Sequence, residues 1–362
     1  MSAVDQRREA AARSVLDQAA WCNALGSPMY GALLERVAED VRDGGPAWRV
    51  MGGRDAKDIA DPLRLLGAVH RLVLTARAPD LAPFYPSVGG SSAAGDPWPA
   101  FRSVLDEQAD AVREGLVRPV QTNEVGRCAA LLGGFLLIAR ETRLPLVLAE
   151  MGASAGLNLR WDRYRYESGG AAWGDPDSPV RFSEPFASGR PPLEVEVEVI
   201  ERRGCDLDPV DPLTEEGRLT LLSFVWPDQT ERLERLRGAL EVAGHVPAQM
   251  ERAEGAEWLE RALREPRNGV ATVVFHTVVE MYLSPEAQGR LRGILASAGE
   301  RATPDAPVAW LKMEHLTGSK PEPGGPTGIG PRNVHLTVWP GGEERAIATA
   351  APHGPPVFWH GP

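Results

Sequence analysis

The amino-acid sequence predicts an α/β protein in which an N-terminal helical domain precedes a doubly wound parallel sheet. The first 140 residues carry apolar side chains mainly at helical spacing, with breaks rich in Pro and Gly. After Leu144, short apolar runs alternate with helical segments, which is typical of a parallel sheet covered by helices. We therefore expect a helical substrate or lid domain over 1–140 and a Rossmann-like domain over 141–362.

Helical spacing and start signals place the helices of the first domain. Ser27-Pro28 marks a helix start, because serine caps a helix and proline fits its first turn. The polar cluster 121–124 is expected to cap the last helix before the sheet. The expected helices cover 6–25, 29–41, 63–74, 97–116 and 125–138.

In the second domain, short apolar runs predict strands and longer amphipathic segments predict helices. The expected strands cover 146–150, 193–200, 245–253, 271–276, 308–314, 334–339 and 346–350. The expected helices cover 155–163, 215–224, 230–243, 256–263 and 285–298. Two intervals, 161–192 and 316–331, are expected to be insertions.

The last two predicted strands are joined by Pro340-Gly341-Gly342, which is a hairpin signal. A hairpin at the end of a doubly wound sheet places one antiparallel strand among parallel ones. This is the architecture of class I S-adenosylmethionine (SAM) methyltransferases, and dinucleotide-binding dehydrogenase sheets do not usually end this way. The predicted sheet is therefore of the class I methyltransferase type.

Composition restricts the partners of the chain. Its 362 residues are 43% hydrophobic and 25% charged, which is normal for a globular protein with a large core. The net charge of −11 disfavours nucleic acid and membrane surfaces as partners. Cys22, Cys128 and Cys205 form no CxxC pair, and the polar N-terminus is no secretory signal, so we expect a cytoplasmic protein with a small-molecule substrate.

The segment Pro145–Leu159, PLVLAEMGASAGLNL, reads as a buried strand followed by a glycine-rich turn and a helix. Gly152 permits a backbone conformation closed to other residues, and Gly156 lets the helix pack close to the strand. We expect unpaired amides at the start of this helix to face a ligand. Glu150, at the strand end, would accept a ribose hydroxyl or an ammonium group and repel a pyrophosphate.

The spacing acid-x-Gly-x-x-x-Gly resembles motif I of SAM methyltransferases, acid-x-Gly-x-Gly-x-Gly, with Ser154 at the middle glycine. A tight strand-to-helix turn that binds nothing is the alternative. The predicted cofactor contacts in this segment are Glu150, Gly152, Ala153, Ser154, Gly156 and Asn158.

Three more acids follow the next predicted strands. Glu201 and Asp206 are candidates for the ribose hydroxyls, although they follow Glu150 by about fifty residues rather than the usual twenty. Glu254 is the candidate for the adenine amino group. The alternatives are that Asp206 is a turn residue and that Glu254 is an ordinary acid at a helix N-terminus.

His276 follows the buried run 271–275 and is the predicted catalytic base, because ligands of open α/β sheets lie beyond the carboxyl ends of strands. Glu314 has a similar place after the next strand. The alternative is that His276 is a packing or hydrogen-bonding residue.

Predicted substrate contacts lie on either side of the motif. Asn123, Glu124 and Arg127 could hold a zwitterion or carboxylate, since arginine binds carboxylates through two nitrogens. Tyr164 lies in a polar and aromatic patch beyond the turn, and Trp226 could stack on a ligand. The alternatives are helix capping with a Glu124–Arg127 ion pair, and buried packing of Trp226. The seven histidines show no metal-binding spacing, so we predict no catalytic metal.

The chain also resembles, nearly end to end, a bacterial family known as domain of unknown function twenty-three thirty-two. The matching segments are GSPMYGALL (26–34), HRLVLTARAPDLAPFYPSVGG (70–90), QTNEVGR (121–127), EMGASAGLNLRWDRYRY (150–166), RRGCDLDPVDP (202–212), FVWPDQTERLERL (224–236) and VVFHTVVEMYL (273–283). This family is usually grouped with SAM-methyltransferase-like Rossmann folds, so the resemblance implies that fold and says little about a reaction.

These observations predict a SAM-dependent methyltransferase that acts on a small-molecule acceptor. An NAD(P)-dependent oxidoreductase and another SAM-using enzyme, such as a cyclase, are alternative enzymes. A regulatory protein that binds a nucleotide-like ligand without turnover is the alternative from another class.

Overall fold

The computed structural model describes residues 2–52, 60–315 and 330–362. These residues divide into two compact units. The described part of the first unit comprises 2–52, 60–122 and 214–233, and that of the second comprises 123–213, 234–315 and 330–362. Within the described residues, the chain therefore enters the second unit, returns to the first over 214–233, and enters the second again.

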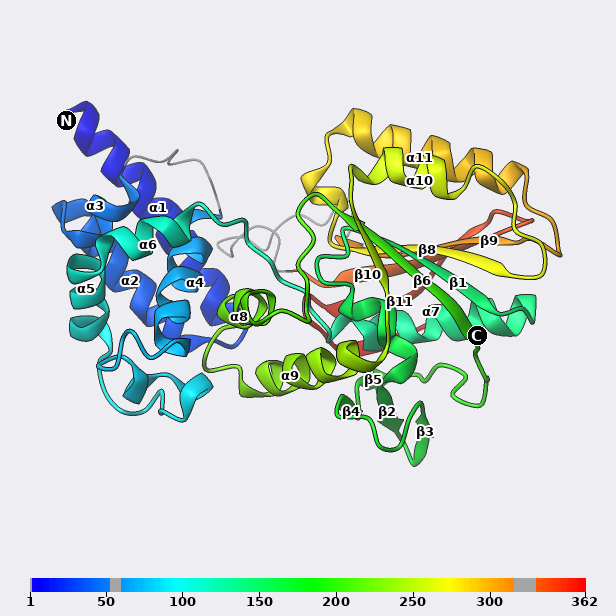
Figure 1. The fold of residues 1–362 in the computed structure, drawn as a ribbon, viewed down its shortest axis with the longest axis horizontal. Coiled ribbons are helices and arrows are strands. Elements are labelled where there is room, and N and C mark those ends of the chain that lie inside the picture. Colours follow the sequence, from blue (N-terminus) through cyan, green and yellow to red (C-terminus); the bar gives the residue numbers. More distant parts are fainter. Residues whose placement is uncertain (1, 53–59, 316–329) are drawn as a thin grey trace. The chain divides into compact units, whose positions relative to one another are not determined.

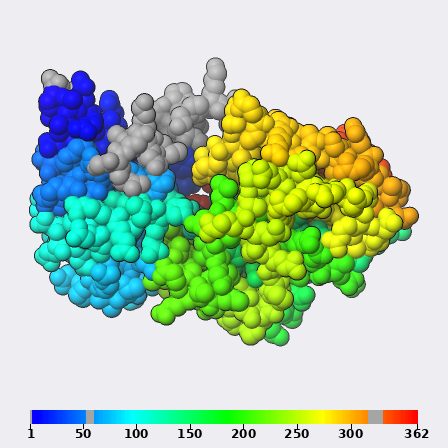
Figure 2. Space-filling view, turned by 45° about the horizontal axis from the view of Figure 1, so that its top comes forward, coloured from blue at the N-terminus to red at the C-terminus, as the bar shows by residue number. Residues whose placement is uncertain are grey.

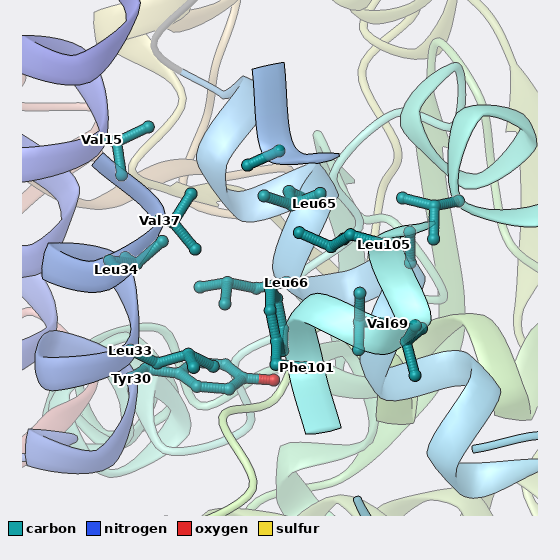
Figure 3. Packing of buried hydrophobic residues seen from close by; sticks show 14 of the residues in the cluster. Val15, Tyr30, Leu33, Leu34, Val37, Leu65, Leu66, Val69, Phe101 and Leu105 are labelled. Carbon is teal, nitrogen blue, oxygen red and sulfur yellow. The ribbon is translucent and has the colours of Figure 1, made fainter. Parts of the chain in front are cut away.

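The first unit is helical, as its apolar spacing predicts. Its main helices are α1 (Ala3–Ala24), α2 (Pro28–Asp43), α3 (Pro46–Met51), α4 (Asp61–Leu74), α5 (Trp98–Glu107), α6 (Ala109–Leu116) and α8 (Glu215–Ser223), with short 3-10 turns at Ala82–Phe84 and Pro86–Val88. Figure 3 shows Leu34 and Val37 of α2 projecting towards Leu66 of α4. Burial of each such side chain contributes about 1.5–3 kcal/mol.

The single helix predicted over 97–116 is wrong in one respect, because the structure divides it into α5 and α6. Gln108, between them, has φ −115° and ψ 30°, which is outside the helical region. Its side-chain amide donates a 2.7 Å hydrogen bond to the carbonyl oxygen of Arg77. That tertiary contact accompanies a break that periodicity alone does not reveal.

The second unit is built on a large, mostly parallel sheet, which confirms the predicted α/β class (Figure 1). Within the described residues the strand order is β5-β12-β11-β10-β9-β8-β1-β6-β7. Strands β7, β6, β1, β8 and β9 run parallel, and β10, β11 and β12 continue as an antiparallel meander. The strands are β1 (Leu146–Met151), β5 (Phe186–Ser188), β6 (Val199–Asp206), β7 (Gln249–Arg252), β8 (Ala271–Thr277), β9 (Val308–His315), β10 (Arg332–Trp339), β11 (Glu344–Ala351) and β12 (Gly354–Trp359).

Helices cover both faces of this sheet. Figure 1 shows α10 (Gly255–Ala262) and α11 (Pro285–Glu300) on one face and α7 (Arg127–Thr142) on the other. The outer sides of α10 and α11 lie on the surface in Figure 2, whereas Trp258 and Leu295 pack inwards against β1 and β9 residues. On the opposite face, Phe135 of α7 packs edge to face against Phe275 of β8, with the two ring centroids 5.2 Å apart. A side chain at Gly133 would collide with Trp359, so glycine there lets α7 lie close to the sheet.

The predicted hairpin is confirmed, since β10 and β11 pair antiparallel on either side of Pro340-Gly341-Gly342. The sheet continues beyond it through β12, a strand that the sequence analysis does not predict. The strand predicted over 193–200 is β6 and begins only at Val199. The predicted helix over 155–163 is instead a 3-10 helix, η3 (Leu157–Arg163), with a non-helical residue at Arg160.

The predicted insertion at 161–192 contains β2 (Arg165–Ser168), β3 (Ala171–Trp173) and β4 (Arg181–Ser183), which form a separate small sheet. Tyr166 and Phe182 stack in it with ring centroids 4.9 Å apart. The other predicted insertion, 316–331, lies almost entirely outside the described residues. The predicted domain boundary at residue 140 also differs from the observed division, because the apolar helix α7 packs on the sheet.

α9 (Thr230–His245) spans the return from the first unit to the second. Among the described helices, none is long and apolar enough to cross a membrane.

Candidate functional site

The candidate site lies at the edge where the parallel strands have their carboxyl ends. β1 ends there in Met151, β6 in Asp206 and β8 in Thr277, and the parallel register keeps these ends together. Open α/β sheets bind ligands at this edge, at the point where the strand order reverses. In this sheet that point lies between β1 and β8.

The turn after β1 has the backbone that its glycines predict. Gly152 and Gly156 have φ of 67° and 66°, in the left-handed region. Ser154 also lies there, with φ 52°. A β-carbon at Gly152 would come 2.8 Å from a methyl group of Val279, so the turn and the segment after β8 touch at this glycine.

The expectation that free amides of this turn face a ligand is wrong. Asn123 Oδ1 accepts hydrogen bonds from the N–H groups of Ala155 and Leu157, at 3.2 and 2.9 Å. Asp206 Oδ2 accepts the N–H of Ser154 at 2.8 Å. The N–H groups of Ala153 and Gly156 donate to backbone carbonyls. The turn is therefore closed by side chains from two distant parts of the chain.

Glu150 is deeply buried behind this turn. Burial raises the pKa of its carboxyl well above the ordinary value of 4.5, and the nearby Asp206 carboxylate acts in the same direction. Asn158 hydrogen-bonds the carboxyl group, and the Cys128 thiol donates to Asn158 Oδ1 at 3.3 Å. Glu150 Oε2 has no hydrogen-bond partner among the described residues. A carboxyl group with a raised pKa, and with one oxygen that lacks a hydrogen-bond partner among the described residues, therefore lies at the end of the central strand.

Of the two predicted ribose acids, Asp206 lies at the turn and Glu201 does not. The carboxylate of Asp206 is fixed by the N–H groups of Ser154 and Asp208, the second at 2.9 Å. Glu201 pairs in register with Val147, near the opposite end of β1, and forms a 2.8 Å ion pair with Arg267.

Glu254 follows β7 at the same edge and caps the N-terminus of α10. Its side chain accepts the N–H groups of Ala256 and Glu257, at 3.0 and 2.9 Å. This geometry matches the alternative role of a helix N-terminal acid. Its prediction as an adenine contact stays a prediction.

His276 is completely buried, and both ring nitrogens are hydrogen-bonded. Nδ1 lies 2.8 Å from Glu314 Oε1, and the indole N–H of Trp310 donates to Nε2 at 3.1 Å. Nδ1 therefore carries the proton that Glu314 accepts. In this arrangement neither nitrogen can take a substrate proton, so a base role would require Trp310 or Glu314 to move away.

The backbone after His276 is strained. Val278 has φ 57°, which is rare for a β-branched residue. Glu314 Oε1 accepts the N–H of Val279 at 2.8 Å, and Met313 accepts that of Val278 at 2.9 Å. The end of β9 therefore holds the strained segment in place. Trp310, which lies on the same strand and contacts His276, belongs to no motif from which the sequence could have predicted this contact.

Arg127 lies at the same edge, where α7 begins. Its guanidinium donates to the carbonyl and hydroxyl oxygens of Thr277, at 3.3 and 3.2 Å, and to the carbonyl of Pro352 at 3.2 Å. Glu124, close by in the chain, accepts the N–H of Gly126 at 3.1 Å.

The structure adds Arg332 and His315, which the sequence analysis does not predict as site residues. They pair in register at the β10 and β9 ends of this edge. Burial, followed by repulsion from Arg127, lowers the pKa of Arg332 to about 10. Burial and the charge of Arg332 also lower the pKa of His315.

The remaining two predicted substrate contacts, Tyr164 and Trp226, are packed inside the protein. Tyr164 is fully buried, its hydroxyl donates to the carbonyl of Leu157 at 2.6 Å, and burial raises its pKa. Trp226 belongs to the first unit and packs in that unit's hydrophobic core, with the Arg232 guanidinium 5.8 Å from its ring centre.

A family model described as an uncharacterised protein conserved in bacteria (DUF2332) matches residues 12–359, so the chain belongs to this family. No curated protein and no solved structure matches the chain. Across residues 2–52, 60–315 and 330–362, no group of three or more His, Cys, Asp or Glu side chains is arranged to hold a metal ion.

Proposed function

We propose that the protein binds SAM at the carboxyl ends of β1, β6 and β7 and transfers its methyl group to a small-molecule acceptor. The parallel strands support this proposal, because β7-β6-β1-β8-β9 has the reversal next to β1 that creates a nucleotide crevice. The acids at the ends of β1 and β6 support it further.

The observation that carries the proposal is the fixed carboxylate of Asp206. The N–H groups of Ser154 and Asp208 each occupy one lone pair, on different oxygens. Each carboxylate oxygen has a second lone pair, so the group can accept two ribose hydroxyls without changing its position. A preoriented acceptor of this kind lowers the entropic cost of binding.

The same contacts argue against the binding of a dinucleotide at this turn. Pyrophosphate binding at a glycine-rich turn needs backbone N–H donors, and Asn123 and Asp206 already accept those of Ser154, Ala155 and Leu157. The Asp206 carboxylate would also repel a pyrophosphate. The neutral adenosyl end of SAM meets neither obstacle.

Bound SAM supplies an electrophilic methyl group, so the chain's own task is to orient an acceptor and exclude water. Because both nitrogens of His276 are engaged, the proposal requires no proton transfer to this residue. The same observation favours a second candidate function, a SAM-binding protein without turnover.

Thermal-shift measurements and calorimetric titration with SAM, S-adenosylhomocysteine, NAD and NADP test the proposal. Both adenosyl compounds should raise the melting temperature, because a ligand that binds only the folded state stabilises it. Asp206→Asn should weaken S-adenosylhomocysteine at least about tenfold, as expected for lost charge-assisted hydrogen bonds. Asp305→Asn, an exposed position before β9, is the matched control. Stabilisation by NAD or NADP and by neither adenosyl compound would contradict the proposal.

Turnover separates the two candidate functions. A protein that binds SAM but produces no S-adenosylhomocysteine with any member of an acceptor panel would fit the second candidate. Formation of S-adenosylhomocysteine that depends on an acceptor would fit the first.

A further inference from the structure

A surface groove lined by charged side chains runs along α10 and α11, on the helix-covered face of the sheet that is seen in Figure 2. The groove has a volume of about 650 Å³, and all six residues that line it are exposed. Four are basic and two are acidic: Arg261, Arg264, Arg290, Arg301, Glu257 and Glu260. We call it the arginine groove, and the candidate site at the strand ends includes none of these residues.

Two of the four arginines have no carboxylate partner among the described residues. Arg264 forms no ion pair there. Arg301 donates to the carbonyl oxygens of Ser297 and Leu263, at 2.7 and 3.0 Å, and forms no ion pair either. Because Leu263 directly precedes Arg264, the two arginines lie at the same end of the groove. That end carries two positive charges without an opposing carboxylate.

The other two arginines extend the groove along the helices. Arg290 forms a 3.1 Å ion pair with Glu260, and Arg261 forms one of 3.5 Å with Glu251. Such exposed pairs contribute little to stability, so their arginines can accept another carboxylate. Arg290 lies in α11 and Arg301 at its C-terminal end, about 16 Å further along the helix axis at 1.5 Å per residue. An extended acidic segment spans that distance, whereas a small anion does not.

The chain itself carries an acidic segment of similar length, 194–198, directly before β6. Glu194, Glu196 and Glu198 are exposed and alternate with Val195 and Val197, which are half-buried. In an extended chain every second side chain points to the same side, so the three carboxylates form one row. The row is at most about 14 Å long. Within the described residues, none of the three carboxylates forms an ion pair.

Backbone contacts hold the acidic segment on the face of the sheet that α7 covers. The indole N–H of Trp173 donates to the carbonyl of Val195 at 2.8 Å. Trp173 stacks on Trp161, which stacks on Phe135 of α7, with ring centroids 5.2 and 4.2 Å apart. The arginine groove lies on the opposite face, beside α10 and α11 (Figure 1). Since the sheet separates them, a contact between groove and acidic segment joins two molecules.

We propose that the arginine groove binds the acidic segment 194–198 of a second copy of the chain. Arginine suits this contact, because its planar fork binds a carboxylate through two parallel hydrogen bonds. The net charge of −11 repels two copies at long range, but salt at physiological strength screens charges more than about 8 Å apart. The paired surfaces differ, so the contact is head-to-tail and builds a ring or an open chain of copies.

Sedimentation velocity of the whole chain, measured over a range of protein concentrations at constant ionic strength, tests the contact. We expect oligomers that grow with concentration. Arg264→Glu and Glu196→Arg should each weaken association at least about tenfold, because like charges then face each other. Arg7→Glu and Glu35→Arg make the same changes of net charge at exposed positions of the first unit. These matched controls should associate as the wild type does.

A mixture of Arg264→Glu and Glu196→Arg guards against variants that fail to fold. The first variant keeps its acidic segment and the second keeps its groove, so the two together can form one unaltered contact. The mixture should therefore associate about as tightly as the wild type. Added salt should weaken this association, because it screens the charges that pair.

Four results would overturn the contact: a wild type that stays monomeric at every concentration, reversal variants that associate as the wild type does, no association in the mixture, or association that strengthens with salt. The last result would mean that apolar surfaces associate against the net repulsion. Hexaglutamate tests another occupant. If it binds a wild type that stays monomeric, and Arg264→Glu abolishes this binding, the groove belongs to an acidic segment of another protein and not to a second copy.

Discussion

Polar groups have different surroundings in two neighbouring parts of the same sheet edge. At the ends of β1 and β6, the backbone N–H groups of the turn donate to side-chain oxygens of Asn123 and Asp206, and burial raises the pKa of Glu150. Beside the ends of β8 and β9, Arg127 at the start of α7 and Arg332 at the start of β10 bring two basic groups to the same edge. Side chains therefore close the first region, whereas the second brings basic groups together.

Backbone strain follows the same division. In the first region the left-handed positions belong to Gly152, Ser154 and Gly156, which are glycines or a small polar residue. In the second, Val278 is a β-branched residue with φ 57°. Such a residue persists only where its surroundings hold it, and the contacts of Glu314 and Met313 do so. The comparison indicates a turn closed by side chains beside a strained edge that carries basic side chains.

The largest effect expected in the closed region follows from Asn123→Ala. This change leaves the N–H groups of Ala155 and Leu157 without their acceptor, and each buried unsatisfied group costs about 1–3 kcal/mol. We expect the free energy of unfolding in urea to fall by about 2–4 kcal/mol. Asn268→Ala, at an exposed position, is the control and should change it by less than about 0.5 kcal/mol. Equal effects of the two changes would show that Asn123 does not hold the turn.

Gly152→Ala tests the contact between the two regions. The new methyl group would collide with the Val279 side chain, and the residue would also keep a positive φ. We therefore expect the free energy of unfolding to fall by about 2–3 kcal/mol. Gly170→Ala is the matched control, because Gly170 has φ 79° but nothing within 4 Å of its β-carbon position. Gly170→Ala should lower the free energy of unfolding by about 1 kcal/mol, because only the cost of placing alanine at a positive φ applies there. If both variants lose the same amount, the two regions do not press on each other at this glycine.

Glu150→Gln has the smallest expected effect, and its pH dependence is the readout. The folded pKa of Glu150 is raised, so the wild type loses stability as the pH rises above the unfolded value near 4.5. Glutamine has no proton to lose. Between pH 4 and pH 8, the free energy of unfolding of the variant should therefore rise by about 1 kcal/mol or more relative to that of the wild type. Denaturant unfolding at pH 4, 6 and 8 measures this gain, and a difference that is constant with pH would mean that Glu150 is ionised in the folded protein.

Sequence patterns predicted the parts of the molecule that depend on neighbouring residues. The continuous apolar run before Glu150 predicts a strand covered on both faces, and Pro340-Gly341-Gly342 predicts the β10–β11 hairpin. They also predicted that Glu150 ends a strand and that Asp206 follows one, although the second strand, predicted over 193–200, is Val199–Asp206 in the structure. In a parallel sheet, that information is enough to bring the two acids to one edge.

What could not be predicted depends on contacts between distant residues. Asn123 lies before α7, and nothing in its local sequence indicates that it would close a turn more than thirty residues away. The indole of Trp310 meets His276 only through the pairing of β8 with β9. Arg332 joins the site because β10 runs antiparallel to β9, which places the beginning of one strand beside the end of the other.

A crystal structure of the chain with S-adenosylhomocysteine tests the central claim most directly. The account predicts an adenosyl group at the carboxyl ends of β1 and β6, with its ribose hydroxyls within hydrogen-bond distance of the Asp206 carboxylate and the turn amides still bound to Asn123. An adenosyl group bound elsewhere, or a ribose without contact to Asp206, would contradict it.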